Sequence, residues 1–90
     1  MPDKRTDIYQ LGVILYELVT GQLPFSGDDV TEIISQIVSE EPPKPSLISH
    51  GATDIEPIVL KCLAKRKEER YQSIEELETD LAEYIIPEIR

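Results

Sequence analysis

The segment from residue 7 to residue 25, DIYQLGVILYELVTGQLPF, constrains the fold most, because it predicts a helix that is apolar around most of its circumference. At about 100° per residue, its apolar side chains cover roughly three quarters of the helix surface. Only Gln10 and Glu17 form a clear polar strip. Such a helix belongs inside a domain, with neighbours on nearly every side. Its apolar positions are Ile8, Leu11, Val13, Ile14, Leu15, Tyr16, Leu18 and Val19.

Signals for helix starts and stops predict four helices and no strand, which places the chain in the all-α class. The four expected ranges are 4–20, 29–40, 54–64 and 74–86. Each of the last three carries a single apolar stripe with i, i+3, i+4 spacing. The simplest packing puts the apolar first helix in the centre, with the three amphipathic helices against it. Residues 41–52, which are rich in proline, are expected to form a loop.

Capping side chains set the expected starts of the later helices. Asp28 is the expected N-cap of the second helix. Thr53 and Glu56 are expected to form a capping box at the start of the third helix, and Ser73 and Glu76 a second box at the start of the fourth. For the first helix, the expected caps are an aspartate before the first turn and a glycine after the last.

The charge balance excludes several kinds of partner. The formal net charge is −9, so clustered Lys and Arg for nucleic-acid phosphates or anionic membranes are not expected. No apolar run approaches the length of about 18 residues that a membrane span needs, and the N-terminal residues have no signal-peptide core. A single cysteine gives no disulfide framework. A reducing, cytoplasmic location is therefore expected.

The sequence shows no motif for chemistry of its own. His50 and Cys62 are the only His and Cys, and they have no ligand spacing, so no metal site is expected. Cys62 falls on an apolar stripe, where a core thiol is expected. No hydrolase elbow, phosphate-cradling glycine loop or zinc-protease motif is present. We therefore expect no catalytic, cofactor-binding or metal-binding residue.

The order of motifs closely resembles the C-terminal lobe of eukaryotic-like Ser/Thr protein kinases, of the type found in bacteria and archaea. Residues 6–25, TDIYQLGVILYELVTGQLPF, are similar to the central helix of that lobe, αF. Residues 58–81, IVLKCLAKRKEERYQSIEELETDL, are similar to its last block, although Arg66 and Lys67 stand where the family usually has Asp-Pro. The resemblance implies that the four expected helices are αF, αG, αH and αI.

This resemblance implies structural roles for five residues. Asp7 looks like the aspartate that accepts hydrogen bonds from the catalytic-loop backbone, and Gly12 belongs to the matched Leu-Gly pair. Ile14 and Leu18 look like anchors of the hydrophobic column under the adenine site. Arg70 looks like the arginine that pairs with the glutamate ending the activation segment.

The elements that perform phosphoryl transfer are absent from these 90 residues. The glycine-rich loop, strand lysine, His-Arg-Asp loop, Asp-Phe-Gly and Ala-Pro-Glu motifs do not occur. We therefore expect a non-catalytic piece of a larger kinase. The parent would use ATP and Mg²⁺ to phosphorylate protein Ser and Thr, and this piece should bind neither.

The resemblance and the incomplete lobe also suggest partners. The rest of the kinase domain is the first, and a protein substrate or regulator could dock on the αG-like helix through Val30, Ile33, Ile34 and Ile37. Self-association is expected, because removing the neighbouring elements would expose apolar surface beside Ile14 and Leu18. Without those elements the charges of the αF-like aspartate and of the arginine are expected to be solvated.

Two other interpretations stay open from the sequence. The first is a self-contained, acidic four-helix interaction module, which an internal partner for Arg70 would favour. The second is an acyl-carrier-like protein, which needs a modifiable serine at a helix start. The nearest match to that pattern is Ser46, inside the proline-rich loop.

Overall fold

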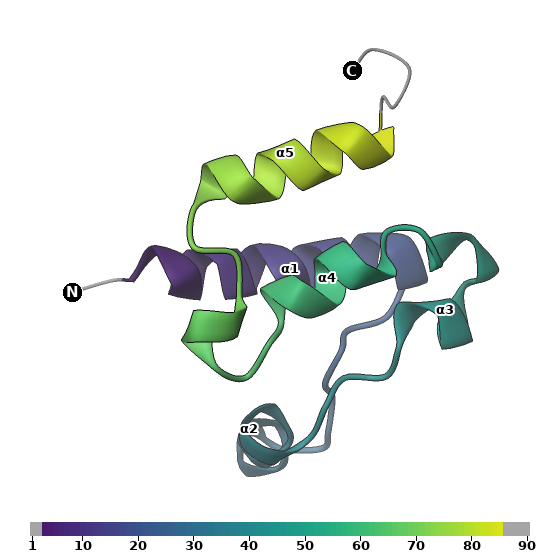
Figure 1. Ribbon diagram of the computed structural model, residues 1–90. Helices are drawn as coiled ribbons and strands as arrows, with labels where there is room; N and C mark the ends of the chain where they lie inside the picture. The colour runs from purple at the N-terminus through teal and green to yellow at the C-terminus, as the bar shows by residue number, and fades with distance from the viewer. Residues whose placement is uncertain (1–2, 86–90) are drawn as a thin grey trace.

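The computed structural model describes residues 3–85, and these form helices and connections without a strand (Figure 1). The expected all-α class is confirmed. The expected last residue of the fourth helix, Ile86, and the proline after it lie outside the described residues. The longer helices are α1 (Lys4–Thr20), α2 (Val30–Ser39), α4 (Glu56–Cys62) and α5 (Ile74–Ile85).

The segment expected to be a loop contains two short helical turns. These are α3 (Pro45–Ile48) and the 3₁₀ turn η1 (His50–Ala52). Pro45 begins α3, where its fixed φ suits a first helical turn and its missing N–H costs little. Pro45 and Ala52 are both buried. A second 3₁₀ turn, η2 (Lys67–Glu69), lies between α4 and α5.

The ends of α1 are capped as the sequence predicts, whereas α2 is capped differently. The Asp3 carboxylate accepts a hydrogen bond from the Arg5 N–H at 2.8 Å. Gly21 has a φ of 75°, and its N–H donates to the Glu17 carbonyl at 2.8 Å. The prediction of Asp28 as the N-cap of α2 is wrong: Asp29 accepts from the Glu32 N–H at 2.8 Å.

The capping box predicted from Thr53 and Glu56 is also wrong. Thr53 already has helical backbone angles, whereas an N-cap needs an extended backbone. The Glu56 carboxylate instead accepts from the Ser46 N–H at 2.9 Å, which ties α4 to α3. At α5 the Ser73 hydroxyl does accept from the Glu76 N–H, at 3.2 Å, so that half of the box is confirmed.

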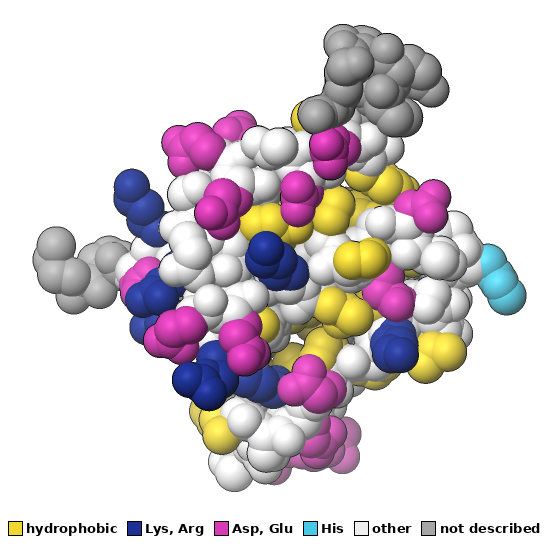
Figure 2. Space-filling model, in the orientation of Figure 1, with side chains coloured by type: hydrophobic (Ala, Val, Ile, Leu, Met, Phe, Trp, Pro, Cys, Tyr) yellow, Lys and Arg dark blue, Asp and Glu magenta, His cyan; other side chains and the backbone are white. Residues whose placement is uncertain are grey.

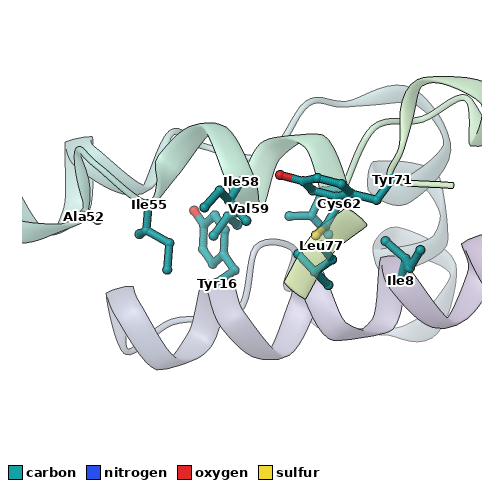
Figure 3. Packing of buried hydrophobic residues seen from close by; sticks show 10 residues of the cluster. Ile8, Tyr16, Ala52, Ile55, Ile58, Val59, Cys62, Tyr71 and Leu77 are labelled. Carbon is teal, nitrogen blue, oxygen red and sulfur yellow. The ribbon is translucent and has the colours of Figure 1, made fainter. Parts of the chain in front are cut away.

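The core lies mainly between α1 and α4, which run side by side (Figures 1 and 3). Gly12 permits their close approach, because a Cβ there would lie 2.6 Å from the Cys62 Cβ. The α5 helix packs on α4 and contributes Leu77 to the same cluster. The buried cluster comprises Ile8, Tyr16, Ala52, Ile55, Ile58, Val59, Cys62, Leu63, Tyr71 and Leu77.

The α2 helix departs from the expected packing, because it has no buried residue. It stands apart from the other helices at the end of two extended segments (Figure 1). Those segments have packing of their own. Phe25 and Pro42 are buried, and the Tyr16 hydroxyl donates to the Pro43 carbonyl at 2.8 Å. The segments are thus fixed to the core while the apolar stripe of α2 stays largely exposed.

Candidate functional site

A groove of about 720 Å³ lies between α1, α2 and the connection from α4 to α5. Val13 and Ile14 of α1 and Ile37 and Val38 of α2 supply apolar walls. Basic residues from the α4–α5 connection form the remaining side. Figure 2 shows Lys and Arg side chains gathered where this connection faces α2. An apolar floor with a few polar groups is the usual form of a binding site.

Arg70 is held by internal partners, which corrects the expectation that its charge is solvated. Its Nε donates to the Ala64 carbonyl at 2.7 Å, and its Nη1 donates to the Arg5 carbonyl at 3.0 Å. A third, longer bond of 3.4 Å joins Nη2 to the Lys65 carbonyl. The guanidinium also lies over the Tyr9 ring, 4.7 Å from its centroid. Arg70 therefore fastens the α4–α5 connection to the start of α1.

Two polar atoms of the groove-lining residues are buried without hydrogen-bond partners among the described residues. They are the Tyr9 hydroxyl and the Lys65 ammonium. Burial raises the pKa of the Tyr9 hydroxyl and lowers the pKa of the Lys65 ammonium, because removal from water disfavours the charged form of each group. The sequence assigns neither residue a role. The only available signal was the Lys65–Lys67 basic run in an acidic chain.

The other residues that the resemblance singled out lie at separate places. Asp7 is exposed in the first turns of α1, and no described residue bonds its carboxylate. Ile14 and Leu18 are 53% and 75% exposed, although they belong to the predicted core helix. Gly12 is buried against α4. The roles assigned to these residues by resemblance stay predictions.

The expected docking positions on α2 divide between two environments. Val30 is 70% exposed, and Ile34 is exposed as well. Ile33 is half-buried, and Ile37 lines the groove. Much of the apolar stripe of α2 therefore faces solvent.

The remaining candidate side chains offer no chemistry in the described part of the chain. Cys62 is fully buried, and burial raises the pKa of its thiol to about 11. His50 is an exposed residue of η1. Residues 3–85 contain no group of three His, Cys, Asp or Glu side chains placed to hold a metal ion. Within the same residues, no helix has both the length and the apolar character needed to cross a membrane.

Comparison of the sequence with known proteins identifies the family of the chain. The sequence model of the family described as protein tyrosine and serine/threonine kinase matches residues 2–81. The chain therefore belongs to the protein kinase family, and it represents a C-terminal kinase fragment with an all-helical fold.

Curated relatives are bacterial Ser/Thr kinases. The chain is 45% identical over 80 residues to the serine/threonine-protein kinase PknB of Mycobacterium tuberculosis, and 42% identical over 80 residues to PknB of Mycolicibacterium smegmatis. It is 40% identical over 84 residues to the probable serine/threonine-protein kinase CE0033 of Corynebacterium efficiens. Each match covers 88% of this chain and 13% of the relative. The chain thus spans only a small part of the length of these relatives.

Proposed function

We propose that this chain is the non-catalytic scaffold of a Ser/Thr protein kinase, and that its helices support catalytic elements supplied by the rest of the kinase domain. The observation that carries this proposal is the one-sided burial of α1. Ile8 and Tyr16 are fully buried, whereas Ile14 and Leu18 are largely exposed on the same helix. A helix that is apolar on nearly all sides needs cover on its second face.

The proposed parent transfers the γ-phosphoryl group of ATP to protein Ser and Thr in the cytoplasm, where ATP is available. Phosphoryl transfer of this kind depends on positioning and on metal-assisted charge stabilisation. In the proposal, ATP and Mg²⁺ bind to the glycine-rich, His-Arg-Asp and Asp-Phe-Gly elements of the parent. The 90 residues bind neither of them and hold those elements in place.

A chimeric kinase tests this proposal. In the chimera, the matching segment of this chain replaces the corresponding 80 residues of M. tuberculosis PknB. We expect the chimera to transfer labelled phosphoryl groups to a protein substrate, and the isolated chain to transfer none. Unmodified PknB is the control. Phosphoryl transfer by the isolated chain, or a folded chimera without activity, would contradict the proposal.

A protein-docking role for α2 is supported by its uncovered apolar stripe. Val30 and Val38 are 70% and 72% exposed, with Ile34 between them. Apolar patches of this kind on soluble proteins commonly mark interaction sites. In the isolated chain, we propose that this surface contributes to self-association together with the exposed apolar face of α1 beside Ile14 and Leu18.

Sedimentation velocity over a range of micromolar concentrations tests the docking surface. The double variant Ile34→Ser/Val38→Ser should associate more weakly than the unmodified chain at the same concentrations. Thr31→Ser, an exposed change on the same helix, is the matched control and should associate normally. An unmodified chain that is monomeric throughout, or a double variant that associates as strongly as the unmodified chain, argues against this role for α2.

A further inference from the structure

Exposed hydroxyl groups without a hydrogen-bond partner gather on α2 and on the loop that leads into it. The exposed Ser and Thr residues whose hydroxyl no described residue bonds are Thr6, Ser26, Thr31 and Ser35. All but Thr6 belong to α2 or to the loop before it. The remaining exposed Ser and Thr hydroxyls of the described residues each donate to a backbone carbonyl. The unbonded hydroxyls on α2 are therefore available to accept a transferred group.

Thr31 is the hydroxyl of this group whose backbone can leave the fold most easily. The Gln36 side chain bonds both the N–H and the carbonyl of Ser26, at 3.2 and 2.8 Å, and so fixes that residue. Ser35 lies in the middle of α2, with helical turns on both sides. Thr31 lies in the first turn of α2, so only that turn has to open before an active site can enclose the side chain.

Opening the first turn of α2 breaks only exposed contacts. The Asp29 carboxylate accepts from the Glu32 N–H at 2.8 Å, and the Glu32 carboxylate accepts from the Asp28 N–H at 3.2 Å. These residues are exposed, and α2 contains no buried residue. Segments with few buried apolar contacts and solvent-exposed hydrogen bonds open at a low cost in free energy. The turn that carries Thr31 is therefore a segment that opens locally while the core stays folded.

Thr31 also borders the exposed apolar stripe of α2. It directly follows Val30 and lies three residues before Ile34, and residues three apart are neighbours on a helix surface. Val30 and Ile34 are 70% and 54% exposed. A phosphate on this hydroxyl would add about −1.5 to −2 charges at pH 7 and three strong acceptor oxygens. Burying the stripe against a partner would then require the phosphate to lose water, which is costly.

We propose that Thr31 is a regulatory phosphorylation site, and that its phosphate weakens docking on the apolar stripe of α2. This inference rests on the docking role proposed for α2 above. The donor is ATP, and the enzyme is a Ser/Thr protein kinase of the kind named among the curated relatives.

The transfer forms one bond and breaks another. The Thr31 Oγ1 bonds to the γ-phosphorus of ATP, while the bond from that phosphorus to the bridging oxygen breaks and ADP leaves with the electron pair. The hydroxyl proton passes to a base of the modifying kinase. The product is a phosphate monoester on the first turn of α2.

Phosphosite mapping by mass spectrometry tests the site, after incubation of the isolated chain with ATP, Mg²⁺ and M. tuberculosis PknB. Thr31 should gain phosphate at least tenfold faster than Thr79. Thr79 is the matched comparison, because it is also exposed and has acidic neighbours, Glu78 and Asp80. Its hydroxyl donates to the Glu75 carbonyl at 2.9 Å, however, and it lies on α5, which packs on α4.

Synthetic peptides and variants separate the effect of the fold from the preference of the kinase. In short peptides that contain Thr31 or Thr79, no fold protects either hydroxyl, so the difference in rate should shrink. In the chain, Thr31→Ala should abolish phosphate incorporation on α2, and Thr31→Ser should retain it. Ser35→Ala, a change on the same helix, is the control and should leave incorporation at Thr31 unchanged.

Sedimentation velocity of the phosphorylated chain tests the effect on docking. The chain that carries phosphate on Thr31 should associate at least fivefold more weakly than the unmodified chain. Thr31→Ala treated with the same kinase and ATP is the control, because it can carry phosphate only at other positions. This control should associate as strongly as the untreated chain.

Three results would overturn the inference: no phosphate on Thr31, equal rates for Thr31 and Thr79 in the folded chain, or unchanged association after phosphorylation of Thr31. A failure of the docking role gives a different result. If Ile34→Ser/Val38→Ser associates as strongly as the unmodified chain, the docking role is rejected, and the effect assigned to the phosphate is rejected with it. If that double variant associates weakly but Thr31 gains no phosphate, only the modification site is rejected.

Discussion

Replacing Arg70 with alanine should destabilise the isolated chain strongly, because the Arg70 side chain fastens the segment between α4 and α5 to the start of α1. The substitution removes bonds of 2.7 and 3.0 Å to the carbonyls of Ala64 and Arg5, a weaker third bond, and the contact with Tyr9. Hydrogen bonds from a charged group contribute about 1.5–3 kcal/mol each, and an exposed cation–π contact contributes about 0.5–1 kcal/mol.

The full sum overstates the loss, because Arg70 is partly exposed and water can replace some of these bonds. We therefore expect Arg70→Ala to lower the free energy of unfolding by about 2–3 kcal/mol. The stability of Arg70→Lys should fall between that of the unmodified chain and that of Arg70→Ala, because an ammonium keeps the charge but cannot reproduce the planar set of donors or the stacking on the ring. For a chain of this size, 1 kcal/mol corresponds to a shift in Tm of about 4–8 °C.

Urea denaturation followed by circular dichroism measures this effect. Arg66→Ala is the matched control, because Arg66 is an exposed residue in the same connection whose ion pair with Glu68 is 3.9 Å long. Exposed pairs contribute little, so this variant should stay within about 0.5 kcal/mol of the unmodified chain. If Arg70→Ala is as mild as Arg66→Ala, the internal role derived for Arg70 is wrong.

Two further variants test the packing of α1 on α4. Gly12→Ala should lower the free energy of unfolding by about 1–2 kcal/mol, because the new Cβ would lie 2.6 Å from the Cys62 Cβ and the overpacking outweighs the gain in helix propensity. Gly51→Ala, with no atom within 4 Å of its new Cβ, is the control, and equal midpoints for the two variants would refute the close approach. Burial raises the pKa of the Cys62 thiol to about 11. The neutral thiol therefore contributes fully to the stability of the fold below the unfolded pKa of about 8.5, and this contribution is lost as the pH rises toward 11, because the thiol ionises first in the unfolded chain. Urea midpoints from pH 7 to 10.5 should therefore fall more steeply for the unmodified chain than for Cys62→Ala, and parallel profiles would contradict this.

The sequence predicts which faces are apolar, but it does not predict what covers them. The all-round apolarity of α1 indicated a core helix, and Ile8 and Tyr16 are indeed fully buried. The stripe of α2 has the same kind of periodicity, yet none of its residues is buried. Periodicity reports which residues share a face, whereas cover depends on how the connecting segments are fixed to the core.

The candidate site was predictable only in part, because its contacts join residues far apart in the chain. Arg70 was singled out by resemblance, but its bond to the Arg5 carbonyl spans 65 positions and involves a backbone atom that no side-chain pattern reveals. The unbonded Lys65 and Tyr9 groups also result from tertiary packing. An internal partner for Arg70 was expected to favour a self-contained interaction module over a kinase fragment. The chain belongs to the kinase family and still has this partner, so the contact does not distinguish the module from the fragment.

In the proposed scaffold function, the uncovered face of α1 is covered when the chain is part of a kinase domain. The most direct test is the rate of thiol labelling of Ile14→Cys, measured by mass spectrometry in the isolated chain and in the PknB chimera. Ile14 is 53% exposed in the isolated chain, and Glu78→Cys on α5 serves as an exposed control. Labelling of Ile14→Cys should be at least tenfold slower in the chimera, with the control unchanged. Equal rates for Ile14→Cys in the two proteins would contradict it.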